Sequence, residues 1–103
     1  GKYQTGTVPD GSRMQLSPEM GGRKTARAFG AVDAYLDIAK RYDLDPSQMA
    51  LAWCAQRPFM GSVIFGATTM AQLDVALGAE DVVLSSEILA EINEAHRAHP
   101  MPY

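Results

Sequence analysis

Apolar residues recur at spacings of three and four between about residue 25 and residue 42, a period that predicts an amphipathic helix. The predicted buried stripe consists of Ala28, Val32, Tyr35, Leu36, Ala39 and Tyr42. A second helix should start at Asp45, a favoured N-cap, with Pro46 at the first helical position and Gln48 at the capping-box position. This helix runs through Gln56 and is apolar on nearly every side, so we expect most of its surface to be buried.

A short apolar run then interrupts the helical pattern. Residues 62–65 read Ser-Val-Ile-Phe, which is typical of a buried parallel strand. Thr69 and Gln72 form a T-x-x-Q capping box that opens a third helix, which Gly78 ends. We expect this helix to turn inward Leu73, Ala76 and Leu77. A lone strand leaves backbone groups unpaired, at a cost of roughly 1–3 kcal/mol for each buried group, so it should belong to a larger α/β domain.

The two ends of the chain differ. Residues 1–24 contain seven glycine or proline residues and few apolar ones, which predicts a long loop. A last helix should begin after Ser85 and stop before Pro100, with its apolar side made of Ile88, Leu89, Ile92 and Ala95. Taken alone, the chain is predicted to be mostly α-helical with one short strand.

Composition and charge limit the classes of function. The 103 residues are 47% hydrophobic and 20% charged, which fits one compact domain, and a net charge of −3 argues against a general nucleic-acid binder. No apolar run approaches a membrane span and Cys54 has no second cysteine to pair with, so we expect a cytoplasmic protein. Residues 1–30 nevertheless carry a net charge of +3, which suits an anionic ligand as well as solvated loop charges.

The turn between the predicted strand and the third helix is a candidate phosphate site. Gly66 would let a ligand approach the backbone, Thr68 and Thr69 offer hydroxyl groups, and the first N–H groups of a helix attract anions. Thr69 and Gln72 would look the same if they only capped the helix, so both interpretations stay open at this point.

Four phrases carry a resemblance across almost the whole chain: GKYQTGTVPDGSR, AYLDIAKRYDLDPSQMALAWCAQRPF, SVIFGATTMAQL and LSSEILAEINEAH. In this order and spacing they resemble the C-terminal third of an aldo-keto reductase of the Tas-like branch. The resemblance implies an α/β fold, the (β/α)8 TIM barrel, and reduction of small aldehydes or ketones with NADPH. It implies, in chain order, a cofactor-side loop (1–24), outer helices (25–60), the last barrel strand (62–65), a phosphate-binding turn and helix (66–77) and a terminal helix (85–99). The remaining barrel strands would pair with residues 62–65.

The resemblance also implies roles for individual residues. Lys2 and Arg13 match basic positions close to the cofactor phosphates. The turn after the last strand matches Gly66, Ala67, Thr68 and Thr69, and Gln72 matches a position that reaches the adenosine 2′-phosphate. Where many members have Glu-Asn, this chain has Val75 and Ala76, which leaves the preference between NADPH and NADH open.

No catalytic or metal-binding residue is predicted within the chain. The family's catalytic Asp, Tyr, Lys and His belong to earlier strands, so the segment alone should be inactive. His96 and His99 are expected at the surface near a helix C-terminus.

Two other classes of function remain as alternatives. The two helices around residues 43–46 resemble a helix-turn-helix DNA-binding module, although the second helix offers almost no polar residues to a groove. The chain could instead be a helical interaction module without enzyme activity that self-associates through its uncovered apolar faces. The enzyme interpretation predicts no nucleic-acid partner and no membrane partner.

Overall fold

The structure, a computed structural model, describes residues 1–103 and contains helices without any strand. Its elements are α1 (Arg13–Leu16), the 3-10 turn η1 (Met20–Gly22), α2 (Ala26–Arg41), α3 (Pro46–Ala55), α4 (Met70–Leu77), the 3-10 turn η2 (Gly78–Asp81) and α5 (Ser86–Ala98). None of these helices is long and apolar enough to cross a membrane.

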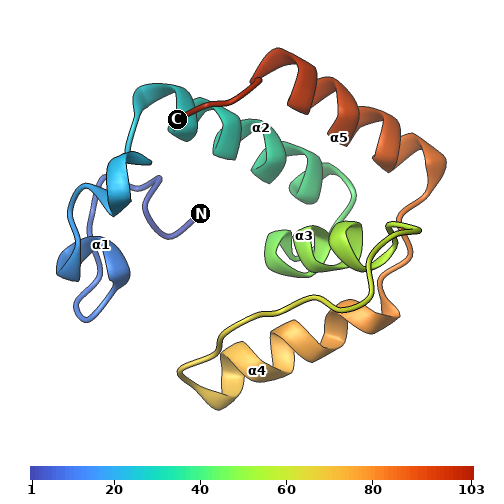
Figure 1. The fold of residues 1–103 in the computed structure, drawn as a ribbon, viewed down its shortest axis with the longest axis horizontal. Coiled ribbons are helices and arrows are strands. Elements are labelled where there is room, and N and C mark those ends of the chain that lie inside the picture. Colours follow the sequence, from blue (N-terminus) through green and yellow to red (C-terminus); the bar gives the residue numbers. More distant parts are fainter.

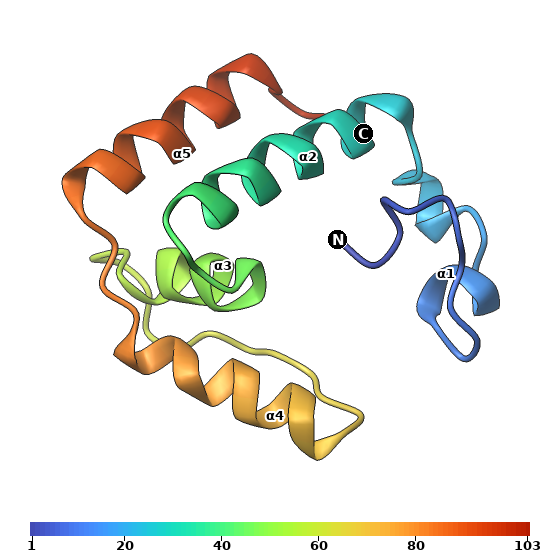
Figure 2. The ribbon, with the colours of Figure 1, turned by 180° about the vertical axis from the view of Figure 1, so that it is seen from behind.

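Helices α2 and α5 run side by side in opposite directions, α3 lies below them, and α4 lies beyond α3 (Figures 1 and 2). The core lies between α2, α3, α5 and the segment that leads into α5. Its buried residues are Ile38, Ala39, Met49, Ala52, Leu84, Ile88, Ile92 and Ala95. The chain after α5 returns to the start of α2, where the Thr25 hydroxyl donates to the Pro102 carbonyl at 2.6 Å.

The predicted helix starts are confirmed by their caps. Asp45 Oδ1 accepts the N–H groups of Ser47 and Gln48 at 2.7 and 3.0 Å, and Ser85 caps α5 through the N–H of Ile88. The side chain of Gln48, however, does not complete a capping box. It donates to the Val75 carbonyl at 3.0 Å and so joins α3 to α4.

The ends of two helices have specific backbone geometry. Asp43 takes a left-handed φ of 52°, which lets the Leu44 N–H reach back to the Ala39 carbonyl at 2.8 Å in a Schellman motif. Gly78 ends α4 as predicted, but its φ of −61° is ordinary. A Cβ at Gly78 would lie 2.4 Å from Gln48 Nε2, so a side chain here would have to displace the Gln48 amide that joins α3 to α4.

The predicted buried faces are only partly correct. The buried residues of α2 are Ala31, Ile38 and Ala39, whereas Val32 is exposed. Only Met49 and Ala52 of α3 are fully buried, and α4 has no buried residue. The expectation of an α3 covered on most sides is therefore wrong for this chain, because no element covers its outer surface. In α4 the expectation is only partly met: Leu73 and Ala76 are half-buried, whereas Leu77 is exposed.

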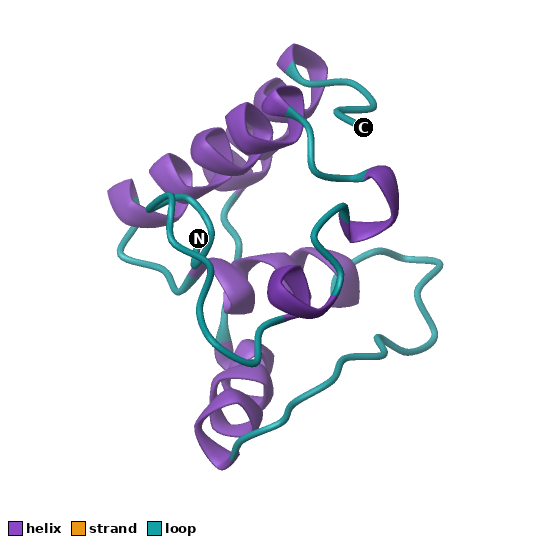
Figure 3. Cartoon of the chain, turned by 90° about the vertical axis from the view of Figure 1, so that its left-hand side faces the viewer, coloured by secondary structure: helices purple, strands orange, loops and turns teal.

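The predicted strand at residues 62–65 is also wrong as a description of this structure. Residues 61–67 form an irregular connection, drawn as a loop in Figure 3. The physical reason is that a strand needs a partner for its backbone groups, and the chain supplies none. The side chain of Ile64 is 95% exposed, and Phe59 and Val83 are each 83% exposed.

Residues 1–24 also differ from the long loop that was predicted, since they contain the short elements α1 and η1.

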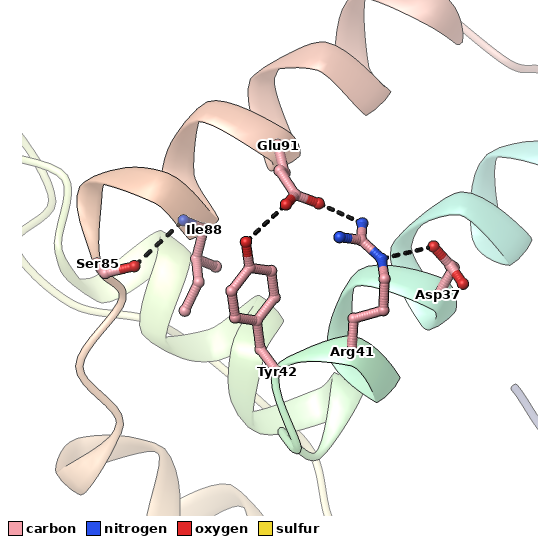
Figure 4. A network of polar contacts seen from close by, with 6 residues as sticks. All are labelled: Asp37, Arg41, Tyr42, Ser85, Ile88 and Glu91. Atoms are coloured by element: carbon pink, nitrogen blue, oxygen red, sulfur yellow. Dashed lines mark hydrogen bonds and ion pairs between the residues drawn. The ribbon is translucent and has the colours of Figure 1, made fainter.

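A polar network joins α2 to α5 (Figure 4). Arg41 bonds Asp37 on its own helix and Glu91 on α5, and the Tyr42 hydroxyl donates to Glu91 Oε1 at 2.6 Å. Arg41 first, and then Tyr42, lowers the pKa of Glu91 to about 2. The same contact with Glu91 raises the pKa of Tyr42 to about 12.

Glu91→Gln should make stability less dependent on acidic pH. Because the pKa of Glu91 is lowered from 4.5 to about 2 on folding, its contribution is complete above 4.5 and is lost as the pH falls toward 2. The wild-type Tm should fall across this window, and the Glu91→Gln Tm should fall less. Glu94→Gln, which changes an exposed pair with Arg97, is the matched control. Parallel Tm curves for wild type and Glu91→Gln would contradict the assignment.

Candidate functional site

The start of α4 is a capped helix terminus built by its own side chains. Thr69 Oγ1 accepts the N–H of Gln72 at 3.2 Å. Gln72 Oε1 in turn accepts two hydrogen bonds from Thr68, from its N–H at 2.8 Å and from its hydroxyl at 3.0 Å. The predicted capping pair is confirmed, with the difference that Gln72 caps the residue before the N-cap.

This arrangement leaves donors free. Because a backbone N–H needs an acceptor, the amide oxygen of Gln72 faces Thr68, and its Nε2 has no partner in the chain. The N–H groups of Met70 and Ala71 also have none, as is usual in the first turn of a helix. Together with the positive end of the helix dipole, these donors suit an anion such as a phosphate.

The approach to these donors is open. A surface pocket of about 430 Å³ lies at the turn, lined by Phe65, Ala67, Thr68, Thr69, Met70 and Leu73. A Cβ added at Gly66 would have no atom within 4 Å, and the φ of Gly66 is not left-handed. No part of the chain therefore obstructs the approach of a ligand to the backbone at this position.

The two predicted basic residues lie elsewhere. Lys2 lines a second pocket against α2, with its Nζ 5.2 Å from the centre of the Tyr3 ring. Arg13 is the exposed first residue of α1. In Figure 1, α1 lies apart from the start of α4. The structure thus brings Gly66 to Gln72 together as one turn, but it does not bring Lys2 or Arg13 to that turn.

The second pocket contains residues that the sequence reasoning missed. Arg23 and Lys24 line it together with Lys2. The Tyr3 hydroxyl, at the same pocket, accepts the Met14 N–H at 3.2 Å, and this bond lowers the pKa of Tyr3. The excess of basic residues in the first thirty positions was the available signal, but nothing in the residue spacing indicated which of them share a pocket.

Comparison with known proteins gives the family. The model of the aldo/keto reductase family matches residues 1–97. The chain belongs to the aldo/keto reductase family. It is 41% identical to Protein tas of Escherichia coli over 102 residues, which cover 99% of this chain and 30% of that protein. It is 32% identical over 95 residues to probable aldo-keto reductase 1 of Glycine max, covering 92% of this chain and 28% of that protein.

The chain is also similar to a protein that is named for a different function. A probable voltage-gated potassium channel subunit beta of Arabidopsis thaliana is 31% identical over 105 residues, covering 97% of this chain and 32% of that protein. The chain spans about 30% of the length of the first relatives it matches. The predicted resemblance to an aldo-keto reductase, with a Tas relative, is confirmed, and a (β/α)8 barrel is the fold this family implies.

Proposed function

We propose that residues 1–103 form the C-terminal, cofactor-binding part of an NADPH-dependent aldo-keto reductase that reduces small aldehydes or ketones. The observation that supports this most is the start of α4. At this turn the chain has free N–H groups on Met70 and Ala71 and a free amide Nε2 on Gln72, and Gly66 nearby is unobstructed. Family membership favours this function over the helix-turn-helix alternative.

The residues of the turn fit the phosphate of such a cofactor. The N–H groups of Met70 and Ala71 would donate to phosphate oxygens, and Gln72 Nε2 would donate to the adenosine 2′-phosphate while Oε1 keeps its bonds to Thr68. NADPH, when bound, supplies a hydride to the carbonyl carbon. The contribution of this chain is to bind and orient that group, since the substrate pocket and proton donor are proposed to lie in the preceding part of the barrel.

The connection at residues 61–67 is proposed to become the last barrel strand beside the other strands. Its exposed Ile64 would then be covered, and its backbone groups would find partners. Helices α2 and α3 would pack outside the barrel.

Gln72→Glu separates helix capping from phosphate binding. Glutamate keeps an oxygen for the N–H of Thr68, but it replaces the free Nε2 donor with a negative charge. In the complete enzyme we expect the Tm to be retained and the Kd for NADPH to rise about tenfold or more, as for the loss of a charged hydrogen bond. The Kd for NADH, which lacks the 2′-phosphate, should change much less.

Gln72→Ala is the matched variant. It removes both the cap and the donor, so the Tm should fall and NADPH should weaken more than NADH. Equal losses for NADPH and NADH in both variants would refute the phosphate role of Gln72 and leave capping as its function.

A further inference from the structure

The pocket beside the start of α2 has an apolar floor. It encloses about 320 Å³ between the N-terminal loop and α2, and the side chains of Met14, Ala28, Phe29 and Val32 line it. Met14 is buried, and Ala28 and Phe29 are half-buried. A pocket of this size and lining can hold a small apolar or aromatic group.

The charged side chains that line this pocket are all positive. Lys2, Arg23 and Lys24 line it, no carboxylate lines it, and none of the three forms an ion pair in the chain. The carboxylate of Asp33, which follows the lining residue Val32 on α2, accepts a hydrogen bond from the side-chain amide of Gln4 and pairs with none of the three basic residues. The pocket lining therefore combines an apolar floor with three positive charges that form no ion pair, which attract and orient an anion.

Two contacts position the segment that carries Arg23 and Lys24. The Arg23 guanidinium lies 5.8 Å from the centre of the Tyr103 ring. Next to Lys24, the Thr25 hydroxyl donates to the Pro102 carbonyl, and Thr25 Oγ1 also caps α2 by accepting the Ala28 N–H at 3.0 Å. The returning C-terminal segment thus holds both basic residues at the positive end of α2, where the helix dipole adds to their attraction for an anion.

We infer that this pocket binds an oxyanion, a carboxylate or a phosphate, attached to an apolar or aromatic body. The body would contact the floor, and the oxyanion would contact Arg23 and Lys24. A guanidinium is suited to this role because it pairs with carboxylate and phosphate oxygens through two parallel N–H groups. The site is distinct from the turn at α4. If the oxyanion is the cofactor diphosphate, the inference rests on the proposed function and extends its site through Lys2; a free carboxylate would make it an independent site.

The test uses the double variant Arg23→Met and Lys24→Met in the complete protein, with calorimetric titration of three probes. The probes are 2-naphthoate, the neutral 2-naphthamide of the same shape, and ADP. We expect the double variant to weaken one of the two anions about tenfold or more, since each charged hydrogen bond contributes strongly, and to leave 2-naphthamide unchanged. The control double variant, Lys40→Met and Arg97→Met, removes the same charge from residues outside the pocket.

The outcomes distinguish the sources. A loss confined to ADP supports the cofactor diphosphate as the oxyanion, and a loss for 2-naphthoate supports a free aromatic carboxylate. Unchanged binding of both anions, failure of both to bind wild type, or an equal loss in the control variant would overturn the inference. The double variant leaves Gln72 unchanged. The proposed function is therefore tested independently, by the Kd values of the Gln72 variants for NADPH and NADH.

Discussion

Gly66→Val in the complete enzyme is expected to weaken NADPH binding by about tenfold or more. A β-branched side chain at the turn would keep phosphate oxygens away from the N–H groups of Met70 and Ala71, and each charge-assisted hydrogen bond lost costs about 1.5–3 kcal/mol. The fold should tolerate the change, because a Cβ at Gly66 meets no atom within 4 Å and the backbone is not left-handed. Fluorescence titration with NADPH and a thermal melt measure the two effects.

Gly61→Val is the matched control for this prediction. Gly61 lies in the same connection and likewise has open space around a Cβ, but it precedes the run expected to form the strand. It should leave NADPH binding nearly unchanged. An NADPH affinity that is the same in Gly66→Val as in wild type would show that no phosphate approaches this backbone.

Helix starts could be predicted from the sequence because their causes are local. A side-chain oxygen at Thr25, Asp45, Thr69 or Ser85 accepts an N–H two or three residues later, so the short stretch contains both partners. The capping interpretation of Gln72 could be predicted for the same reason. The free Nε2 of Gln72 could not be predicted, because it depends on the amide oxygen, rather than the amide nitrogen, being the atom that binds Thr68.

Features that depend on distant partners could not be predicted in the same way. Residues 62–65 have the composition of a buried strand, but the chain contains no strand to pair with them. Helix α3 has the composition of a buried helix, but no layer of the chain covers its outer surface. Gln48 was assigned to its own helix, whereas its amide binds Val75 in α4. The pocket of Lys2, Arg23 and Lys24 depends on how the N-terminal loop folds onto α2, which no periodicity encodes.

The 103-residue chain by itself is expected to show no carbonyl reductase activity. Reduction needs a proton donor beside the substrate oxygen, and three of the four tyrosines of this chain are engaged in other contacts. The Tyr42 hydroxyl donates a hydrogen bond to Glu91, and this contact raises the pKa of Tyr42 to about 12. A raised pKa makes the hydroxyl a weaker acid at neutral pH. Tyr35 packs against the core, and the Tyr103 ring lies against Arg23.

Tyr3 is the remaining tyrosine that could act as the proton donor, so the experiment compares wild type with Tyr3→Phe. Its pKa is lowered and Lys2 lies over its ring, but its hydroxyl accepts the Met14 N–H at the second pocket, whose lining contains no residue of the turn at α4. The loss of NADPH absorbance with a reactive aldehyde should match the rate without protein, for wild type and Tyr3→Phe alike. Size-exclusion chromatography establishes whether the tested chain is monomeric, since its uncovered Phe59, Ile64 and Val83 favour self-association. Turnover in wild type that Tyr3→Phe abolishes would place an acid in this chain and refute the proposal that the proton donor lies in the preceding part of the barrel.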